Sequence, residues 1–354
     1  KVICSDINDD KILKLKSGEI PIYEPGLEEI VKRNVQNNRL FFSSDISSSI
    51  KKSEVIIIAV GTPQSDSGDA DLQYVYSVVK AIKENLNDYK VICTKSTVPI
   101  GTGKKITKIL KTNFKENSDF NYVSNPEFLR EGSAVKDFLW PDRIIIGTSS
   151  LIAFETMCDV YRPLYINKSP ISHTSVETAE MIKYASNSFL ALKISYINEI
   201  ANLCESVGAD VHDVASAMGK DGRISGKFLH PGPGFGGSCF PKDLESLSSI
   251  SDEHGVQMDT LTAAITANRK QKKQMCNKLE KLVTTGIKDK VIAVLGLSFK
   301  ANTDDIRESS SIDIIKYILS KGGHVRAYDP IANDAMSALF PNISYFQNVY
   351  EAID

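Results

Sequence analysis

The chain has 354 residues, of which 42% are hydrophobic and 24% are charged, and its formal net charge is -2. This length predicts two or three globular domains. The near-neutral charge, with no segment dense in Lys and Arg, argues against a nucleic-acid-binding protein. We expect neither a membrane span nor a signal peptide, because no apolar run is long enough and no such leader opens the chain.

The cysteines and histidines bear on the compartment and on metal binding. Six cysteines are widely scattered and form no CxxC pair. A reducing, cytoplasmic compartment is therefore expected. The five histidines show no spacing typical of metal ligands, so no metal site is predicted.

Short β-branched runs alternate with helical stretches in the first half of the chain. The runs that indicate buried strands are 1–6, 55–60, 91–95 and 143–147, and helical patterns at 25–34 and 71–86 lie between them. Near-continuous apolar runs are typical of a parallel sheet covered on both faces. Residues 1–170 are therefore predicted to form a doubly wound α/β domain.

The middle of the chain has a helical pattern. A long helix is predicted at 176–206, where five residues at 3–4 spacing form one apolar stripe: Ile182, Ala185, Phe189, Leu192 and Tyr196. A second helical stretch covers about 259–283, and residues 171–285 are assigned to a central helical domain. The chain then returns to α/β in residues 286–354, with strands at 291–297 and 324–328 and a helix at 312–321.

Both ends of the chain look cut. Asp6 closes a strand where the ribose-binding acid of a dinucleotide fold would lie, and the glycine fingerprint of such a fold comes about 20 residues earlier. The second α/β domain offers only two clear strands, which are few for a stable sheet. We therefore expect an internal portion of a longer chain, with the pyrophosphate-binding loop outside it.

Asp6 and Lys11 are the first candidate binding residues. A carboxylate at a strand end can accept hydrogen bonds from both ribose hydroxyls of NAD and repels a 2′-phosphate. A helix N-cap explains Asp6 equally well. Lys11, one helical turn further on, is placed either to reach the cofactor phosphates or to pair with Asp6.

Thr62 and Thr97 follow two further predicted strands, in the segments VGTP and KSTVP. Ligands of open α/β sheets bind outside the carboxyl ends of the strands. A proline nearby keeps the backbone extended and leaves the hydroxyl directed into the crevice. Simple turn chemistry is the alternative, and it is the better explanation for either segment alone.

Two further pairs are ambiguous. If NPEFLREG is helical, Glu127 and Glu131 share a face beside Arg130, where they can manage a water or a proton relay. As isolated residues, a solvated surface pair is favoured. Lys183 and Asn187 lie four apart on the long helix, where they can bind an oxyanion, although a lysine beside a core is more often a snorkelling side chain.

The segment FLHPGPGFGGSCFPKD, residues 228–243, is the most informative. Its glycines strip away side chains, so that a ligand can approach the backbone. A helix begins next, with Pro241 in its first turn. Cys239 at this helix start, with Lys242 nearby, is favoured as a thiolate nucleophile, and Asp243 is placed to orient a water. A structural cysteine is the weaker alternative.

Lys300 and Arg307 lie in GLSFKANTDDIRES, which follows a strand of the second α/β domain. Two cations at a strand end suit phosphates or sugar hydroxyls. Salt bridges with Asp304 or Asp305 explain them equally well.

Together these segments resemble the UDP-glucose dehydrogenase family. NPEFLREG, KYASNSFLALK, GPGFGGSCFPKD and GLSFKANTDDIRESS occur in the family's order and spacing, and the match runs from Asp6 to Pro330. The resemblance implies an α/β fold with an N-terminal Rossmann-like NAD domain, a long central helical dimerisation region and a C-terminal Rossmann-like UDP-binding domain. It implies a homodimer or higher homo-oligomer that serves polysaccharide biosynthesis.

The implied activity is the NAD-dependent, two-step oxidation of UDP-glucose to UDP-glucuronate through a cysteine thiohemiacetal and thioester. The implied catalytic residues are Cys239, Lys183, Asn187, Asp243, Glu127, Glu131 and Thr97. Those implied to bind NAD are Asp6, Lys11, Thr62, Thr97, Glu131, Lys242 and Arg307. Those implied to bind the nucleotide sugar are Glu127, Phe128, Leu129, Arg130, Glu131, Lys183, Asn187, Arg223, Phe228, Leu229, His230, Pro231, Gly232, Gly236 and Lys300, with Arg223 reaching a neighbouring subunit's substrate.

Two alternatives stay open. Sister dehydrogenases act on GDP-mannose or UDP-N-acetylhexosamines, but SCFPKD resembles the UDP-glucose branch. A non-catalytic nucleotide-sugar-binding protein would need no thiol, and Cys239, Lys183 and Asp243 occur here together.

Overall fold

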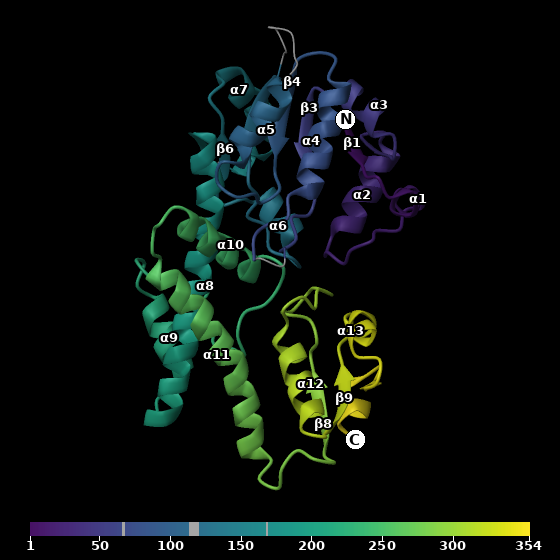
Figure 1. Cartoon of the computed structure of the whole chain (residues 1–354). Helices are drawn as coiled ribbons and strands as arrows, with labels where there is room; N and C mark the ends of the chain where they lie inside the picture. Colours follow the sequence, from purple (N-terminus) through teal and green to yellow (C-terminus); the bar gives the residue numbers. More distant parts are fainter. Residues whose placement is uncertain (66–67, 113–119, 168) are drawn as a thin grey trace. The chain divides into compact units, whose positions relative to one another are not determined.

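The computed structural model describes residues 1–65, 68–112, 120–167 and 169–354. The chain forms two compact units, Lys1–Tyr184 and Ala185–Asp354. Figure 1 shows the elements of both units in chain order. Each unit contains a parallel β-sheet with helices packed on it, which confirms the predicted α/β fold class.

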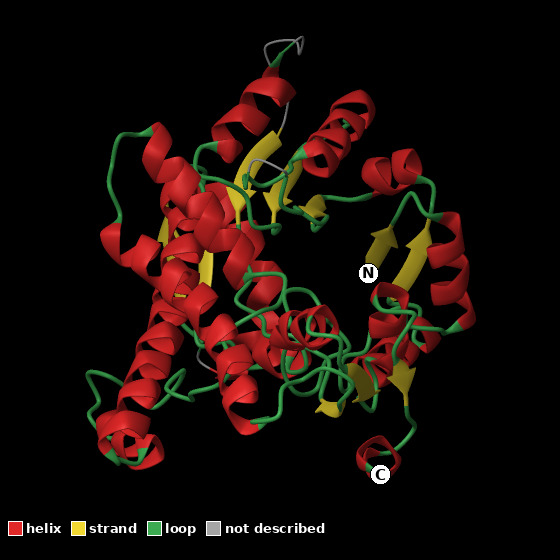
Figure 2. Cartoon of the chain, turned by 60° about the horizontal axis from the view of Figure 1, so that its bottom comes forward, coloured by secondary structure: helices red, strands yellow, loops and turns green. Residues whose placement is uncertain are grey.

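The first unit contains seven described strands in two sheets. They are β1 (Val2–Ser5), β2 (Leu40–Ser43), β3 (Val55–Ile58), β4 (Lys90–Thr94), β5 (Phe120–Ser124), β6 (Ile144–Gly147) and β7 (Ile171–Thr174). β1 and β2 form a parallel pair, which lies beside the N-terminus in Figure 2. The larger sheet has the order β3-β4-β5-β6-β7, parallel except for β5–β6. β2, β5 and β7 were not predicted: the apolar run of β2 is short, and polar residues interrupt β5 and β7.

The helices of the first unit are α1 (Asp9–Ser17), α2 (Leu27–Gln36), α3 (Ile46–Lys52), α4 (Gln73–Asn85), α5 (Thr102–Lys111), α6 (Ala134–Leu139) and α7 (Leu151–Tyr161), followed by a 3-10 turn at Arg162–Asn167. Of these, α4 and α5 pack on one face of the larger sheet and α7 on the other, while α1 and α2 contact β2 and α3 contacts β1. Side chains alternate along β4: Ile92 packs with α4 and α5, whereas Val91 and Cys93 pack with α7. Burial on both faces explains why the centre of this strand, Val91–Cys93, is apolar.

Helix α8 (Val176–Val207) begins in the first unit and continues into the second. Its long helical pattern was predicted, but the expected stripe is not one buried face. Phe189 is 62% exposed and Tyr196 is 48% exposed. The buried side includes Asn187, Ser195 and Asn198. Polar side chains can be buried there because they find partners, such as the carbonyl of Ala264 for the Ser195 hydroxyl.

The second unit combines helices with a small sheet. Its elements after α8 are α9 (Val211–Gly219), α10 (Phe240–Glu253), α11 (Asp259–Leu282), β8 (Val291–Leu295), α12 (Ser310–Ser320), β9 (His324–Tyr328), α13 (Asn333–Leu339), β10 (Ser344–Tyr345) and α14 (Val349–Ile353). The strands are parallel, in the order β10-β9-β8. Leu297, Ile315, Val325 and Met336 form part of the core between this sheet and its helices.

Two features are absent from the described residues. None of the helices there has the length and hydropathy needed to cross a membrane. The same residues contain no group of three or more His, Cys, Asp and Glu side chains suited to a metal ion.

Candidate active site

Asp6 follows the carboxyl end of β1, and the Asp6 carboxylate has two local partners. It accepts hydrogen bonds from the Asn8 backbone at 3.0 Å and from the Lys11 ammonium at 2.7 Å. The Lys11 hydrogen bond holds the pKa of Asp6 below its usual range. The N-cap of α1 is Asn8, so the N-cap explanation of Asp6 is wrong. Lys11 pairs with Asp6, one of the two roles predicted for it.

Thr62 and Thr97 lie together at neighbouring strand ends. The Thr62 hydroxyl donates to the Thr97 carbonyl at 2.9 Å, joining the segments that follow β3 and β4. Thr62 is 8% exposed, whereas a Cβ added to Gly61 would meet no atom within 4 Å. An acid after β1 and open backbone after β3, both at carboxyl ends of strands, fit a dinucleotide site.

Glu127 and Glu131 do not lie on a helix, so they do not share the helical face that was considered for them. Residues 125–130 have no regular structure, and Glu131 is in a turn before α6. The Glu127 carboxylate binds the Lys183 ammonium at 2.9 Å and accepts from the Leu129 backbone at 2.5 Å. The solvated pair is also wrong for Glu127, because Lys183 of α8 holds it.

Lys183 is a buried cation. Its side chain is 4% exposed, so the snorkelling explanation is wrong. Its ammonium also donates to the Glu127 carbonyl at 2.8 Å and lies 5.5 Å from the ring of Phe128. Arg143 also contacts this ring: its guanidinium carbon lies 3.9 Å from the ring centroid of Phe128. A buried lysine requires such partners to stay charged.

Arg130 and the end of the NPEFLREG loop are held by acidic residues that the motif does not contain. Arg130 forms a two-point ion pair with Asp137, at 2.9 and 2.6 Å. Glu24 accepts from the backbone of Gly132 at 2.7 Å and of Ala134 at 2.8 Å. Glu24 lies over a hundred positions earlier in the sequence, and no local pattern indicates this contact.

Cys239 is the N-cap residue of α10, which confirms its predicted place at a helix start. The Asp243 amide donates to the Cys239 carbonyl at 2.8 Å, and Pro241 lies in the first turn. The Ser238 hydroxyl is 3.6 Å from the Cys239 sulfur. Amide groups at a helix N-terminus carry partial positive charge, and Cys239 lies at that end of α10.

Asp243 is the centre of a buried polar cluster beside Cys239. It is 1% exposed. One carboxylate oxygen accepts from the Lys242 ammonium at 2.6 Å and the other from the Asn187 amide at 2.6 Å. The carboxylate is thus balanced by one cation and oriented from α8. Pairing explains how an acid can be so deeply buried.

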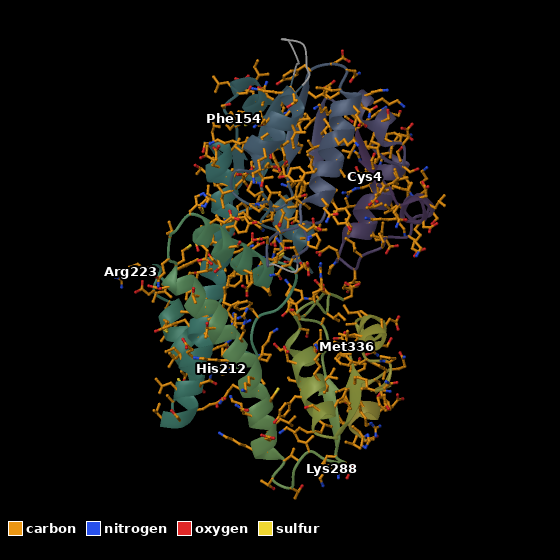
Figure 3. The ribbon with its side chains drawn as sticks, in the orientation of Figure 1. Cys4, Phe154, His212, Arg223, Lys288 and Met336 are labelled. Atoms are coloured by element: carbon orange, nitrogen blue, oxygen red, sulfur yellow. The ribbon has the colours of Figure 1, made fainter. Side chains whose placement is uncertain are left out.

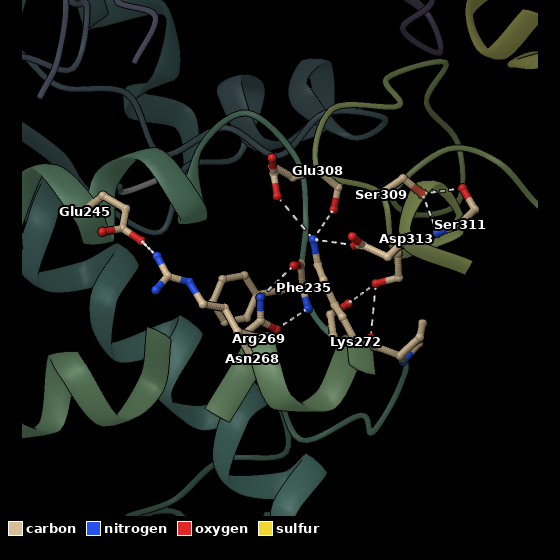
Figure 4. A network of polar contacts seen from close by, with 12 residues as sticks. Phe235, Glu245, Asn268, Arg269, Lys272, Glu308, Ser309, Ser311 and Asp313 are labelled. Carbon is tan, nitrogen blue, oxygen red and sulfur yellow. Dashed lines mark hydrogen bonds and ion pairs between the residues drawn. The ribbon is translucent and has the colours of Figure 1, made fainter. Parts of the chain in front are cut away.

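The glycine-rich loop is fastened to neighbouring helices on both sides. The Gly232 amide donates to Asn198 at 2.8 Å, and its carbonyl accepts from Gln271 at 2.8 Å. Asn268 makes a reciprocal pair with the Phe235 backbone, at 2.7 and 3.0 Å. Figure 4 shows this pair beside Lys272, which binds Glu308 and Asp313. These anchoring residues were not predicted, since their partners are backbone groups.

The remaining predicted substrate residues differ in exposure. Leu229 is 3% exposed, whereas His230 is exposed and Pro231 partly so. Phe228 has a φ of 65°, and its ring centroid lies 6.1 Å from that of Phe240. The fifth, Arg223, extends from the surface, where Figure 3 labels it, and pairs with Asp221 at 2.6 Å.

Arg307 and Lys300 take different partners. Arg307 forms a two-point ion pair with Asp305, at 2.9 and 2.7 Å, one of the alternatives stated for it. Lys300 lies 5.3 Å from the ring of Phe299. The Arg307 side chain is 64% exposed, so its guanidinium is also accessible from solvent.

The strand ends and the cysteine helix define a class of protein. A carboxylate and open glycine backbone at the carboxyl edge of parallel strands, with a thiol at a helix N-terminus in the second unit, are features of a dinucleotide-dependent dehydrogenase. Family comparison agrees. The NAD binding domain, central domain and UDP binding domain of the UDP-glucose/GDP-mannose dehydrogenase family match residues 1–165, 177–270 and 293–354. The chain belongs to this family and is an NAD-dependent enzyme.

Individual relatives agree with the family match. The chain is 49% identical to UDP-glucose 6-dehydrogenase TuaD of Bacillus subtilis, over 100% of this chain and 76% of the relative. A UDP-glucose dehydrogenase structure from Pyrobaculum islandicum superposes with a TM-score of 0.95 at 35% identity, covering 100% of this chain and 82% of that one. A UDP-D-ManNAc dehydrogenase structure from Pyrococcus horikoshii has a TM-score of 0.84 at 29% identity, covering 93% and 78%.

Proposed function

We propose that the protein oxidises UDP-glucose to UDP-glucuronate in two successive steps, with Cys239 as the covalent nucleophile. The observation that carries this proposal is the thiol at the N-terminus of α10, one turn before the buried Asp243. A binding protein needs neither group. The higher identity to the UDP-glucose 6-dehydrogenase of B. subtilis than to the UDP-D-ManNAc dehydrogenase structure supports the glucose substrate.

Most of the proposed cofactor contacts come from residues of the first unit. Asp6 binds the ribose hydroxyls, and Lys11 lies beside it to meet a phosphate. Thr62 and Thr97 contribute after β3 and β4, while Glu131, Lys242 and Arg307 are further predicted contacts. When bound, NAD accepts the hydrogen and two electrons of each oxidation.

The residues of the chain carry the covalent steps. The first oxidation converts the C6 alcohol to an aldehyde and releases a proton. The Cys239 thiolate then forms a carbon–sulfur bond to the aldehyde carbon, giving a thiohemiacetal oxyanion. Lys183 and Asn187, one turn apart on α8, stabilise this oxyanion with a charge and an amide donor.

The second oxidation leaves a thioester on Cys239. A water molecule attacks its carbonyl carbon, the carbon–sulfur bond breaks, and the thiolate returns as the carboxylate product leaves. Asp243 orients this water or takes its proton, with Lys242 balancing the charge. Glu127 is the alternative base, because its carboxylate is partly exposed beside Lys183. Covalent capture keeps the aldehyde bound between the two oxidations.

The nucleotide sugar is expected to contact Phe128 to Glu131 and the 228–232 segment, with Gly236 and Lys300 next to its diphosphate. The anchored glycine loop supports this, since its backbone is held by Asn198, Gln271 and Asn268. Arg223 is exposed, as a residue that serves a neighbouring subunit would be. A cytoplasmic location stays a prediction of the sequence.

Stoichiometry tests the proposed reaction. With purified protein, UDP-glucose and NAD, two NADH should form per sugar consumed, and the product should be UDP-glucuronate by mass spectrometry. The same assay with NADP should give little turnover, because Asp6 repels a 2′-phosphate. One NADH per sugar, or a preference for GDP-mannose or a UDP-N-acetylhexosamine, would contradict the proposal.

We also propose that α8 forms a homodimer contact. Phe189, Tyr196 and Leu203 are 62, 48 and 56% exposed and recur every seven residues, which places them on one side of the helix. A second copy is the occupant that would bury this self-complementary stripe.

The dimer is tested by adding charge to the stripe. Phe189→Glu combined with Leu203→Glu should convert the dimer into monomers in light scattering, because two carboxylates would be buried at the contact. His212→Glu, an exposed change on α9, is the control. An unchanged mass for the double variant would show that the contact lies elsewhere.

A further inference from the structure

Glu180 is a buried carboxylate that the proposed reaction does not use. It lies in the second turn of α8 and is 2% exposed. Its two carboxylate oxygens accept hydrogen bonds from the backbone of Gly101 at 2.6 Å and of Gly103 at 2.8 Å. Gly101 is the N-cap of α5 and Gly103 is in its first turn. The side chain therefore caps the start of one helix from another.

Helix α5 packs closely against the start of α8 at Gly103. A Cβ on Gly103 would lie 2.4 Å from a methyl carbon of Val176 and 2.6 Å from the Tyr122 ring. Gly101 has a φ of 88°, a left-handed conformation that glycine adopts without steric cost. The carboxylate thus binds amides whose positions are sterically determined.

The loop that Glu180 fastens carries Thr97. Residues 96–101 form most of the connection between β4 and α5. At the β4 end, Ser96 donates from its amide to the Ile58 carbonyl at 3.1 Å, and the Thr97 carbonyl accepts from Thr62. At the α5 end, Glu180 binds Gly101. The loop is thus held at both ends, and Val98 between them is buried in the core of the unit.

We propose that Glu180 is a positioning residue for NAD: by capping α5 it fixes the 96–101 loop, and with it Thr97 and Thr62, at the cofactor site. This rests on the proposed function. Lys183, three residues further along α8, binds Glu127 in the loop after β5. The first turns of α8 thus hold two loops: Glu180 binds the 96–101 loop, and Lys183 binds the loop after β5.

The electrostatics agree with a role beyond stability. Burial raises the pKa of Glu180 to about 7, although the two amide hydrogen bonds act in the opposite direction. The charged or titratable neighbours of Glu180 are Glu177, Lys104 and Tyr122. An acid with a raised pKa disfavours folding once ionised: the cost is absent below its ordinary pKa and complete above about pH 7. A group retained at such a cost is a candidate for function.

The test compares Glu180→Gln with Glu177→Gln. Glu177 lies one turn earlier on α8 and makes an exposed ion pair with Lys104, so it is a matched control. In Glu180→Gln the amide nitrogen faces a backbone donor and one hydrogen bond is lost. The dissociation constant for NAD should rise about tenfold, which corresponds to roughly 1.4 kcal/mol. The constant for UDP-glucose should stay within twofold, and Glu177→Gln should match the wild type in both.

The pH profile provides a second readout. As pH falls from 8 to 6, one Glu180 oxygen becomes a hydroxyl, so wild-type affinity for NAD should weaken, whereas the Glu180→Gln profile should be flat. If that variant does not fold, the wild-type profile alone decides. An unchanged NAD constant in Glu180→Gln, or a flat wild-type profile, would overturn the role of Glu180. Failure of the wild type to bind NAD would instead refute the proposed function.

Discussion

Cys239→Ser should abolish sustained NADH production from UDP-glucose. Serine lacks a thiolate and is a weaker nucleophile toward the aldehyde, so no thioester stage follows. We expect turnover to fall by a factor of roughly 10³ or more, the scale reached when the nucleophile of a covalent mechanism is removed. The measurement is steady-state NADH formation, with intact-protein mass spectrometry to detect any trapped sugar adduct.

The variant should nevertheless fold and bind NAD. Cys239 is an N-cap residue of intermediate exposure, and serine is favoured at N-caps. Cys158→Ser is the matched control, since Cys158 is also of intermediate exposure but lies on α7 of the first unit. If Cys239 is only structural, Cys239→Ser will keep turnover within a few-fold of the wild type. That result would remove it from the mechanism.

The glycine loop shows how much of the site could be predicted from the sequence. Glycine density and the following Pro241 indicated a close-approach loop and a helix start, because both effects are local. The partners of Asp243 were not indicated. Its hydrogen bond with Asn187 joins residues 56 positions apart, and only the packing of α8 against α10 brings them together.

The fold shows the same division. β4 was predicted because its central residues are apolar and buried on both faces, and β9 is a strand in which buried Val325 and Ala327 alternate with more exposed residues. The helical stretch at about 259–283 was also predicted, and it corresponds to α11. The side of α8 that is buried was mispredicted, since Phe189 and Tyr196 look like core residues. Burial of Asn187 depends on Asp243, a tertiary contact that overrides the hydrophobic pattern.

Gly236→Ala should destabilise the second unit. A Cβ at this position would lie 2.1 Å from the carbonyl oxygen of Glu308 and 2.7 Å from its carbonyl carbon. Both are backbone atoms. Glu308 cannot easily retreat, because it has a φ of 54° and its carbonyl accepts from Lys272 at 3.0 Å. The adjacent Gly237 amide donates to the Arg307 carbonyl at 2.8 Å, which ties the two loops together.

Separation of these loops should cost about 2–3 kcal/mol, the upper part of the range for overpacking. That cost corresponds to a fall in Tm on the order of 5–10 °C, which calorimetry can measure. UDP binding should weaken as well, because the segment containing Lys300 and Arg307 packs against the glycine loop through Phe299 and Glu308.

Gly232→Ala is the matched control for this prediction. A Cβ there would meet no atom within 4 Å, and its φ is not in the left-handed region. Its Tm should stay within about 2 °C of the wild type or rise slightly, because alanine lowers the entropy of the unfolded chain. Equal Tm values for the two variants would show that the Glu308 backbone moves aside at little cost. The loop would then be fastened mainly by Asn268 and Asn198, whose removal would become the larger effect.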